Sequence, residues 1–101
     1  MKVVLSATAA REFAVAVEWW RENRPAAPTL LEDEMALELR RLADVPFLGQ
    51  AVLNGRLRGL RRISLEESRY HLYYRVLEKR GVVWVVRLWH MSRSAAKLPK
   101  R

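Results

Sequence analysis

The hydrophobic pattern of this sequence changes its period once along the chain, and that change limits the folds open to it. Between residues 7 and 43 apolar side chains recur every three or four positions, whereas between residues 57 and 90 they follow a two-residue alternation. The first spacing is typical of amphipathic helices and the second of strands. Helices and strands that occupy separate stretches of one chain predict the α+β class.

A first helix is expected from residue 7 to about residue 23. Ser6 or Thr8 can cap its amino terminus, because a hydroxyl there accepts a hydrogen bond from a free backbone N–H of the first turn. Its inward face is marked by apolar side chains at spacings of three, four and three: Ala10, Phe13, Val17 and Trp20. The prolines at positions 25 and 28 end this helix, since the residue before a proline avoids helical backbone angles.

A second helix is expected after these prolines, up to about residue 43. Thr29 and Glu32 have the spacing of a capping box, in which side chains and backbone satisfy each other at the helix start. The apolar stripe of this helix consists of Leu31, Met35, Leu39 and Leu42. Because the linker between the two helices is short, they should pack as an antiparallel hairpin.

Four strands are expected, one before the helices and three after them. Residues 2–5 (KVVL) form the first, and residues 57–64, 69–77 and 82–90 form the others. Only four residues link the last two strands, so these should pair as an antiparallel hairpin in which Gly81 adopts a positive φ. The resulting order is β-α-α-β-β-β, with a mostly antiparallel sheet of about four strands.

The charge of the chain is distributed unevenly. Residues 1–55 hold 6 basic and 8 acidic side chains, a net charge of −2, whereas residues 56–101 hold 13 basic and 3 acidic ones, a net charge of +10. Arginine outnumbers lysine ten to three in the second half. The planar guanidinium suits phosphate and carboxylate, so the pattern favours an acidic partner or nucleic acid over a merely solubilising surface.

Several classes of protein are excluded by what the sequence lacks. It has no cysteine, which excludes disulfides and thiolate catalysis, and only two histidines, so we expect no metal and no cofactor. No apolar run approaches the roughly 20 residues that cross a bilayer, and the apolar stretch near the first residue is too short for a signal-peptide core. We therefore expect a cytoplasmic protein without a membrane partner.

Three stretches of the chain are typical of one family. The strand "RYHLYYRV" is followed by a short turn and by "VVWVVRLWHMSRS", and the second helix with its loop reads "LLEDEMALELRRLADVPFLG". In this order the stretches resemble the RelE/ParE family of bacterial toxins, over about residues 2–94. The resemblance implies that the helical hairpin packs on the sheet. It also implies a toxin domain at residues 1–94, which leaves a flexible basic tail at 95–101.

The resemblance further implies a partner and a target. It implies the toxin of a type II toxin–antitoxin system, whose cognate antitoxin covers the basic surface with an acidic segment in a hetero-oligomer. ParE-like members of the family poison DNA gyrase, whereas RelE-like members cleave mRNA in the ribosome. The segments "YYRV" and "LWH" look closer to the ParE-like branch, which we favour. Met91 and Ser92 stand where the family has Gly and Arg, so an inactive antitoxin-binding module is a third hypothesis.

The candidate site residues lie in the second half of the chain. Arg69, His71, Tyr73 and Arg75 alternate onto one face of their strand. The residues expected to bind nucleic acid or the target are Arg62, Arg69, His71, Tyr73, Arg75, Arg87 and Arg93. In a nuclease, Arg75 would hold the phosphate and His90 would act as acid or base. The same arginines can also bind an acidic antitoxin without any chemistry.

Overall fold

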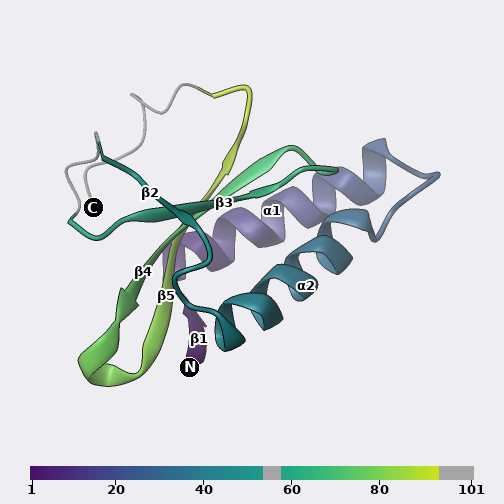
Figure 1. The fold of residues 1–101 in the computed structure, drawn as a ribbon. Coiled ribbons are helices and arrows are strands. Elements are labelled where there is room, and N and C mark those ends of the chain that lie inside the picture. Colours follow the sequence, from purple (N-terminus) through teal and green to yellow (C-terminus); the bar gives the residue numbers. More distant parts are fainter. Residues whose placement is uncertain (54–57, 94–101) are drawn as a thin grey trace.

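The computed structural model describes residues 1–53 and 58–93 and confirms the α+β class (Figure 1). Its elements, in chain order, are β1 (Lys2–Leu5), α1 (Ala7–Asn23), α2 (Leu30–Asp44), β2 (Gln50–Ala51), β3 (Arg61–Leu65), β4 (Tyr70–Leu77), the 3-10 helix η1 (Glu78–Arg80) and β5 (Val82–His90). The first strand, both helices and the β4–β5 hairpin agree with the prediction. The expected flexible tail at 95–101 lies outside the described residues.

The sheet is mixed and has five strands, in the order β1-β5-β4-β3-β2. Strand β1 runs parallel to β5, and every other pair is antiparallel. The fifth strand is β2, which was not expected: its two residues, Gln50 and Ala51, pair with Arg62 and Arg61 at the start of β3. The expected strand at 57–64 was placed too early, because Arg58 and Gly59 form a turn and Gly59 has a φ of +74°. Strand β3 therefore begins only at Arg61.

Helix α1 begins at the predicted cap but turns a slightly different face inward. The Ser6 hydroxyl accepts the Ala9 N–H at 3.0 Å, as expected of an N-cap. Ala9 and Ala16 are buried with Trp20, whereas Ala10 is exposed, so its predicted core position was wrong. Alanines occur on several faces of this helix, and their spacing alone does not decide which one approaches the sheet.

Helix α2 buries the predicted stripe but does not use the predicted capping box. Three stripe residues are buried and Leu39 is half-buried. The Thr29 side chain makes no cap bond and instead donates its hydroxyl hydrogen to Asp33 at 3.1 Å. Glu32 instead accepts hydrogen bonds from the Arg21 guanidinium of α1, with N–O distances of 2.9 to 3.2 Å. A contact between the helices thus replaces the expected local cap.

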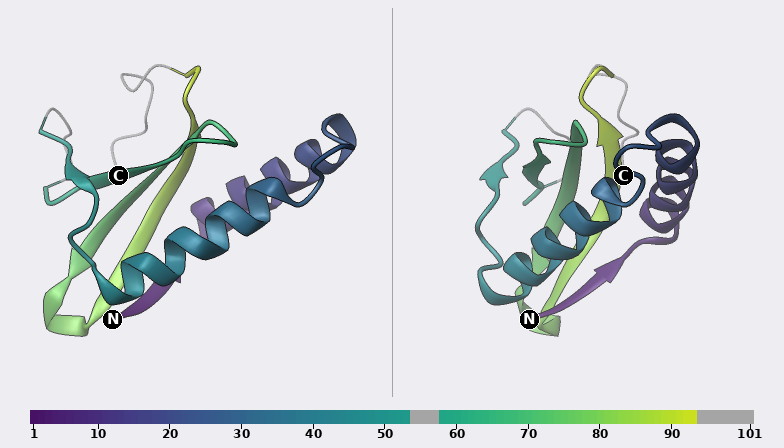
Figure 2. Two further views of the ribbon diagram at one scale, coloured as in Figure 1. Left: turned by 45° about the vertical axis from the view of Figure 1, so that its right-hand side comes forward. Right: turned by 90° about the vertical axis from the view of Figure 1, so that its right-hand side faces the viewer.

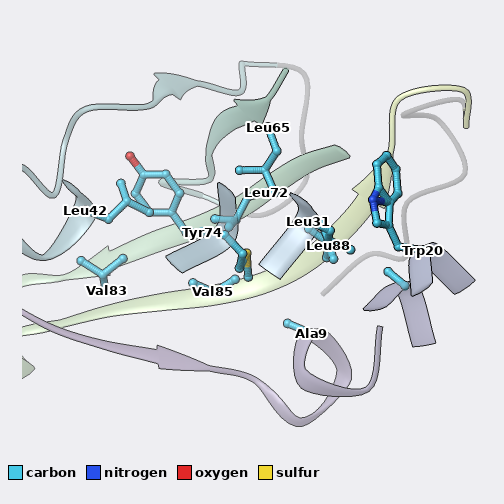
Figure 3. Close-up of a cluster of buried hydrophobic side chains, with 12 residues drawn as sticks. Ala9, Trp20, Leu31, Leu42, Leu65, Leu72, Tyr74, Val83, Val85 and Leu88 are labelled. Atoms are coloured by element: carbon cyan, nitrogen blue, oxygen red, sulfur yellow. The ribbon is translucent and has the colours of Figure 1, made fainter. Parts of the chain in front are cut away.

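The main core lies between the two helices and one face of the sheet (Figure 2). Figure 3 shows its side chains, which come from α1 and α2 and from β3, β4 and β5. At its edge the Tyr74 hydroxyl accepts the Gly49 N–H at 2.7 Å, which fastens the segment after α2 to the central strand. A smaller cluster on the opposite face consists of Leu60, Tyr73, Val86 and Trp89, packed with Val52 and Trp84. We call that second face the distal face.

A bulge in β5 sets which side chains reach each face. Tyr73 pairs with Arg87 and Tyr74 with Val85, which leaves Val86 as the extra residue on β5. Val85 and Leu88 consequently both belong to the main core although they are three positions apart. Because β5 is apolar at nearly every position, its sequence does not reveal this shift.

Candidate functional site

The distal face brings together the predicted residues of the central strand. His71 and Tyr73 of β4 lie opposite Ser64 and Arg62 of β3, and on the other side His71 lies opposite Trp89 of β5. Side chains that are directly opposite on neighbouring strands share a face of the sheet. The structure therefore places His71 and Tyr73 on one face, as their alternation predicts, and the strand register brings Arg62 beside them.

His71 is held as a neutral side chain within this group. Its Nδ1 lies 3.0 Å from the Ser64 hydroxyl oxygen. Burial lowers the pKa of His71 below its ordinary value, the positive charge of Arg62 lowers it further, and Glu66 opposes both effects. His71 therefore acts near pH 7 as a hydrogen-bonding group rather than as a fixed positive charge.

Tyr73 and Arg62 contribute differently to the distal face. Tyr73 is only 2% exposed and belongs to the small distal cluster, so it supports the face from below. Arg62 is half-buried, and its Nε has no hydrogen-bond acceptor among the described residues. A buried donor without an acceptor is uncommon and costs free energy, and this Nε has almost no exposed surface through which a ligand could reach it.

His90 faces the other side of the sheet, at the end of β5. It pairs with Tyr70, and their rings meet edge to face with centroids 5.0 Å apart. Its Nδ1 accepts the Ser92 backbone N–H at 3.1 Å and lies 2.7 Å from the Ser92 hydroxyl oxygen. Burial raises the pKa of Tyr70, and the charge of Arg93 partly offsets that effect. This corner therefore holds an oriented imidazole beside a protonated phenol.

Arg75 does not join His90. Tyr70 pairs with His90, whereas Arg75 pairs with Trp84 five positions further along β4. At about 3.3 Å per residue, the backbones of Arg75 and His90 are about 17 Å apart along the strands. The two residues expected to share one phosphate in a nuclease therefore lie at opposite ends of the hairpin.

Arg87 is bound within the protein. Its Nε lies 3.0 Å from both carboxylate oxygens of Glu12 on α1, and its Nη2 lies 2.5 Å from one of them. The same carboxylate accepts the Leu88 backbone N–H at 3.0 Å. The exposed fractions of the Arg87 and Glu12 side chains are 15% and 21%. This arginine fixes the helix to the bulged strand and is poorly available to a target.

The two remaining predicted arginines lie near the same end of the sheet as His90. The Arg93 guanidinium lies over the Trp89 ring at 4.8 Å from its centroid. Arg69 is exposed in the β3–β4 turn with a φ of +69°, and its carbonyl accepts the Met91 N–H. Ser64 and Trp89 were missed by the sequence prediction, because only the strand register places them beside His71.

Two further observations concern the described residues 1–53 and 58–93. They contain no cluster of three or more His, Cys, Asp or Glu side chains that could hold a metal ion. None of their helices is long and apolar enough to cross a membrane.

The fold is shared by solved structures of bacterial toxins. It is similar to a structure described as the chromosomal ParDE system of P. aeruginosa, with a TM-score of 0.72 and 16% identity over 91% of this chain and 97% of that one. It is also similar to the intact E. coli RelBE toxin–antitoxin complex, with a TM-score of 0.62 and 21% identity over 91% of this chain and 98% of that one. A YoeB/ParE toxin from Agrobacterium tumefaciens gives a TM-score of 0.62 and 18% identity over 89% of this chain and 98% of that one.

These likenesses define the class as the fold of the RelE/ParE toxins. A family model described as "ParE toxin of type II toxin-antitoxin system, parDE" matches residues 3–95. The chain therefore belongs to the ParE toxin family of type II toxin–antitoxin systems. Comparison with curated protein sequences gives no significant match.

Proposed function

We propose that this toxin arrests bacterial growth by inhibiting DNA gyrase in the cytoplasm, and that a cognate antitoxin neutralises it through an acidic segment. The observation that carries the proposal is the match of residues 3–95 to the ParE toxin family. The basic second half of the chain supports the proposal, because residues 56–101 contain 13 basic side chains and only 3 acidic ones. Such a surface attracts an acidic antitoxin segment.

The placement of the candidate residues also favours binding over RNA cleavage. Cleavage at a 2′-hydroxyl needs a base, an acid and a positive charge within reach of one phosphate. Arg75 pairs with Trp84 at the far end of the hairpin from His90. Arg87 is bound to Glu12 and is not available to hold a phosphate there.

A ribosome-dependent mRNA endonuclease is the second candidate. It is favoured by the corner of Tyr70, His90 and Arg93, in which an oriented imidazole lies next to a protonated phenol and near a guanidinium. The third candidate is an inactive antitoxin-binding module. It is favoured by Ser92, which binds His90 Nδ1 where an arginine is expected from the family pattern.

The test compares two reconstituted activities of the purified chain. We expect it to block supercoiling of a relaxed plasmid by DNA gyrase, and to leave mRNA ends unchanged in a translating extract. The antitoxin encoded beside its gene should restore supercoiling and raise the melting temperature of the toxin by mass action. Codon-positioned mRNA ends without gyrase inhibition would overturn the proposal in favour of the nuclease, and antitoxin binding with neither activity would favour the inactive module.

Variants of His90 and Arg75 sharpen this comparison. Removing a group that transfers protons or stabilises charge in a nuclease lowers the rate by about a hundredfold or more. Losing one contact of a binding surface costs only about 1 kcal/mol, or roughly fivefold in affinity. Under the proposal, His90→Ala and Arg75→Ala therefore reduce toxicity gradually, provided that each variant still binds the antitoxin.

A further inference from the structure

A depression lies at the β4–β5 hairpin, at the opposite end of the hairpin from His90. Its volume is about 420 Å³, within the size range of small-molecule sites. The residues that line it are Arg75, Leu77, Glu78, Lys79, Arg80 and Trp84. The family assignment gives this place no role, and of its lining residues only Arg75 is also a candidate contact for the proposed gyrase target.

The walls of the depression are held in place by the hairpin. Arg75 and Trp84 lie directly opposite each other on β4 and β5, so their side chains leave the same face of the sheet. Trp84 is half-buried and packs against the distal cluster, which fixes its ring. Gly81 closes the turn with a φ of +65°, and its carbonyl accepts the Lys2 N–H of β1 at 3.2 Å.

The depression carries unneutralised positive charge. Three of its lining side chains are cationic and one, Glu78, is anionic, so their sum is +2. None of these four forms an ion pair with another residue in the part of the chain that the structure describes. Arg21, Arg41 and Arg87, by contrast, each bind a carboxylate.

We propose that this depression binds a nucleoside phosphate, either free or as one unit of a single strand. The guanidinium of Arg75 presents a planar fork that matches two phosphate oxygens, and Arg80 and Lys79 add charge beside it. The indole of Trp84 offers a flat surface on which a base stacks. The carboxylates of an acidic peptide would also fit the Arg75 fork, but such a peptide would leave the Trp84 indole without a flat partner.

The proposed site is separate from the corner around His90. The backbones of Arg75 and His90 are about 17 Å apart along the strands, by the rise of about 3.3 Å per residue. The inference also does not rest on gyrase as the target. A chain that binds nucleotide but does not inhibit gyrase would contradict the proposed function alone. A chain that inhibits gyrase but does not bind nucleotide would contradict only this inference.

The test measures binding of two probes to the full chain. Fluorescence anisotropy follows a labelled single-stranded thymidine dodecamer, and calorimetry follows ATP as the free nucleoside phosphate. Arg75→Ala and Arg80→Ala should each weaken binding about tenfold, because each loses a charge-assisted hydrogen bond. For the thymidine dodecamer, each variant should also make the slope of log affinity against log salt concentration less steep by about 0.7.

Matched variants separate a site from general attraction. Arg40→Ala removes the same charge from an exposed position of α2 and should change affinity less than twofold. Trp84→Phe keeps a stacking surface and should bind nearly as well as the parent chain, whereas Trp84→Leu should bind several-fold more weakly. If Trp84→Leu fails to fold, the two arginine variants and their salt slopes still decide whether the depression is a binding site.

The outcomes assign or overturn the site. ATP binding with the same dependence on Arg75 assigns free nucleotides, and binding of the strand alone assigns a nucleic acid. Equal losses for Arg40→Ala and Arg75→Ala would overturn the proposal, because the attraction would then be diffuse. A glutamate decapeptide provides the last comparison. If it displaces both probes, and if this displacement depends on Arg75 but not on Trp84, the proposal is overturned and an acidic peptide is the occupant.

Discussion

The ion pair between Glu12 and Arg87 should be the most important single polar contact between the helices and the sheet. Replacing Glu12 by alanine leaves a guanidinium that is only 15% exposed without its counter-ion, and leaves the Leu88 N–H without its acceptor. Breaking a fully buried pair costs about 3–5 kcal/mol, and the residual exposure of both side chains reduces that figure. With the lost backbone bond included, we expect Glu12→Ala to cost about 3 kcal/mol.

The assay is urea unfolding followed by tryptophan fluorescence, arranged as a double-mutant cycle. Arg87→Met should cost about 2 kcal/mol, less than Glu12→Ala. The double variant should cost no more than Glu12→Ala alone, so the coupling free energy equals the cost of Arg87→Met, about 2 kcal/mol. A loss of about 3 kcal/mol also corresponds to a melting temperature about 12 °C lower in a domain of this size.

A control and a refuting result complete the cycle. Glu18→Ala removes an exposed carboxylate of the same helix and should change stability by less than about 0.5 kcal/mol. A coupling free energy below about 0.5 kcal/mol would show that the pair contributes no more than a surface salt bridge. Arg87 would then be free to serve a target, as the sequence suggested.

Three other features give predictions of the same kind. Tyr74→Phe leaves the buried Gly49 N–H without its 2.7 Å acceptor and should lower the free energy of unfolding by about 1–2 kcal/mol in urea. Gly49→Ala places a Cβ 2.6 Å from the Tyr74 hydroxyl oxygen, so it should cost more than Tyr74→Phe in the same assay. Glu34→Gln weakens the three hydrogen bonds at 2.5 to 3.0 Å that clasp the β3–β4 turn, and should speed amide exchange at Ser68 while costing about 1–2 kcal/mol. The pKa of His71 is lowered from 6.5 in the folded chain, so the unfolded chain binds more protons and the free energy of unfolding falls as the pH drops below about 6.5. The variant His71→Asn should flatten this pH dependence. An NMR titration of the folded chain with a His71 midpoint above 6.5 would contradict the prediction.

The order of elements was predictable because each one satisfies its own local pattern. The stripe of α2 and the alternation of β4 are strong signals, and the first strand and the β4–β5 hairpin follow from length and turn residues. The short strand β2 was not predictable in this way. It has only two residues, and its pairing with Arg61 and Arg62 depends on how the preceding segment is fastened by the Gly49–Tyr74 contact.

The site was less predictable than the fold because it depends on register. Alternation correctly grouped His71 with Tyr73 on one strand, but it carries no information about which neighbours lie across from them. The bulge at Val86 shifts the faces of an apolar strand, and nothing in its composition marks the shift. Arg87 likewise looked free in the sequence, because its partner Glu12 is 75 positions away.

The two halves of the chain use their charges in different ways. Most carboxylates that form contacts on the helices act there or at the nearby turn: Glu32 binds Arg21, Glu38 pairs with its own helix, and Glu34 accepts N–H groups from the β3–β4 turn. Glu12 alone forms an ion pair with a sheet arginine among the described residues. Among the described residues of the basic half, Arg87 is therefore the only cation that an ion pair neutralises, and the charge of the others remains available outside the fold. An acidic antitoxin segment would be attracted to this unpaired charge, so we expect neutralisation to work by covering the basic surface, with no change of the toxin fold required.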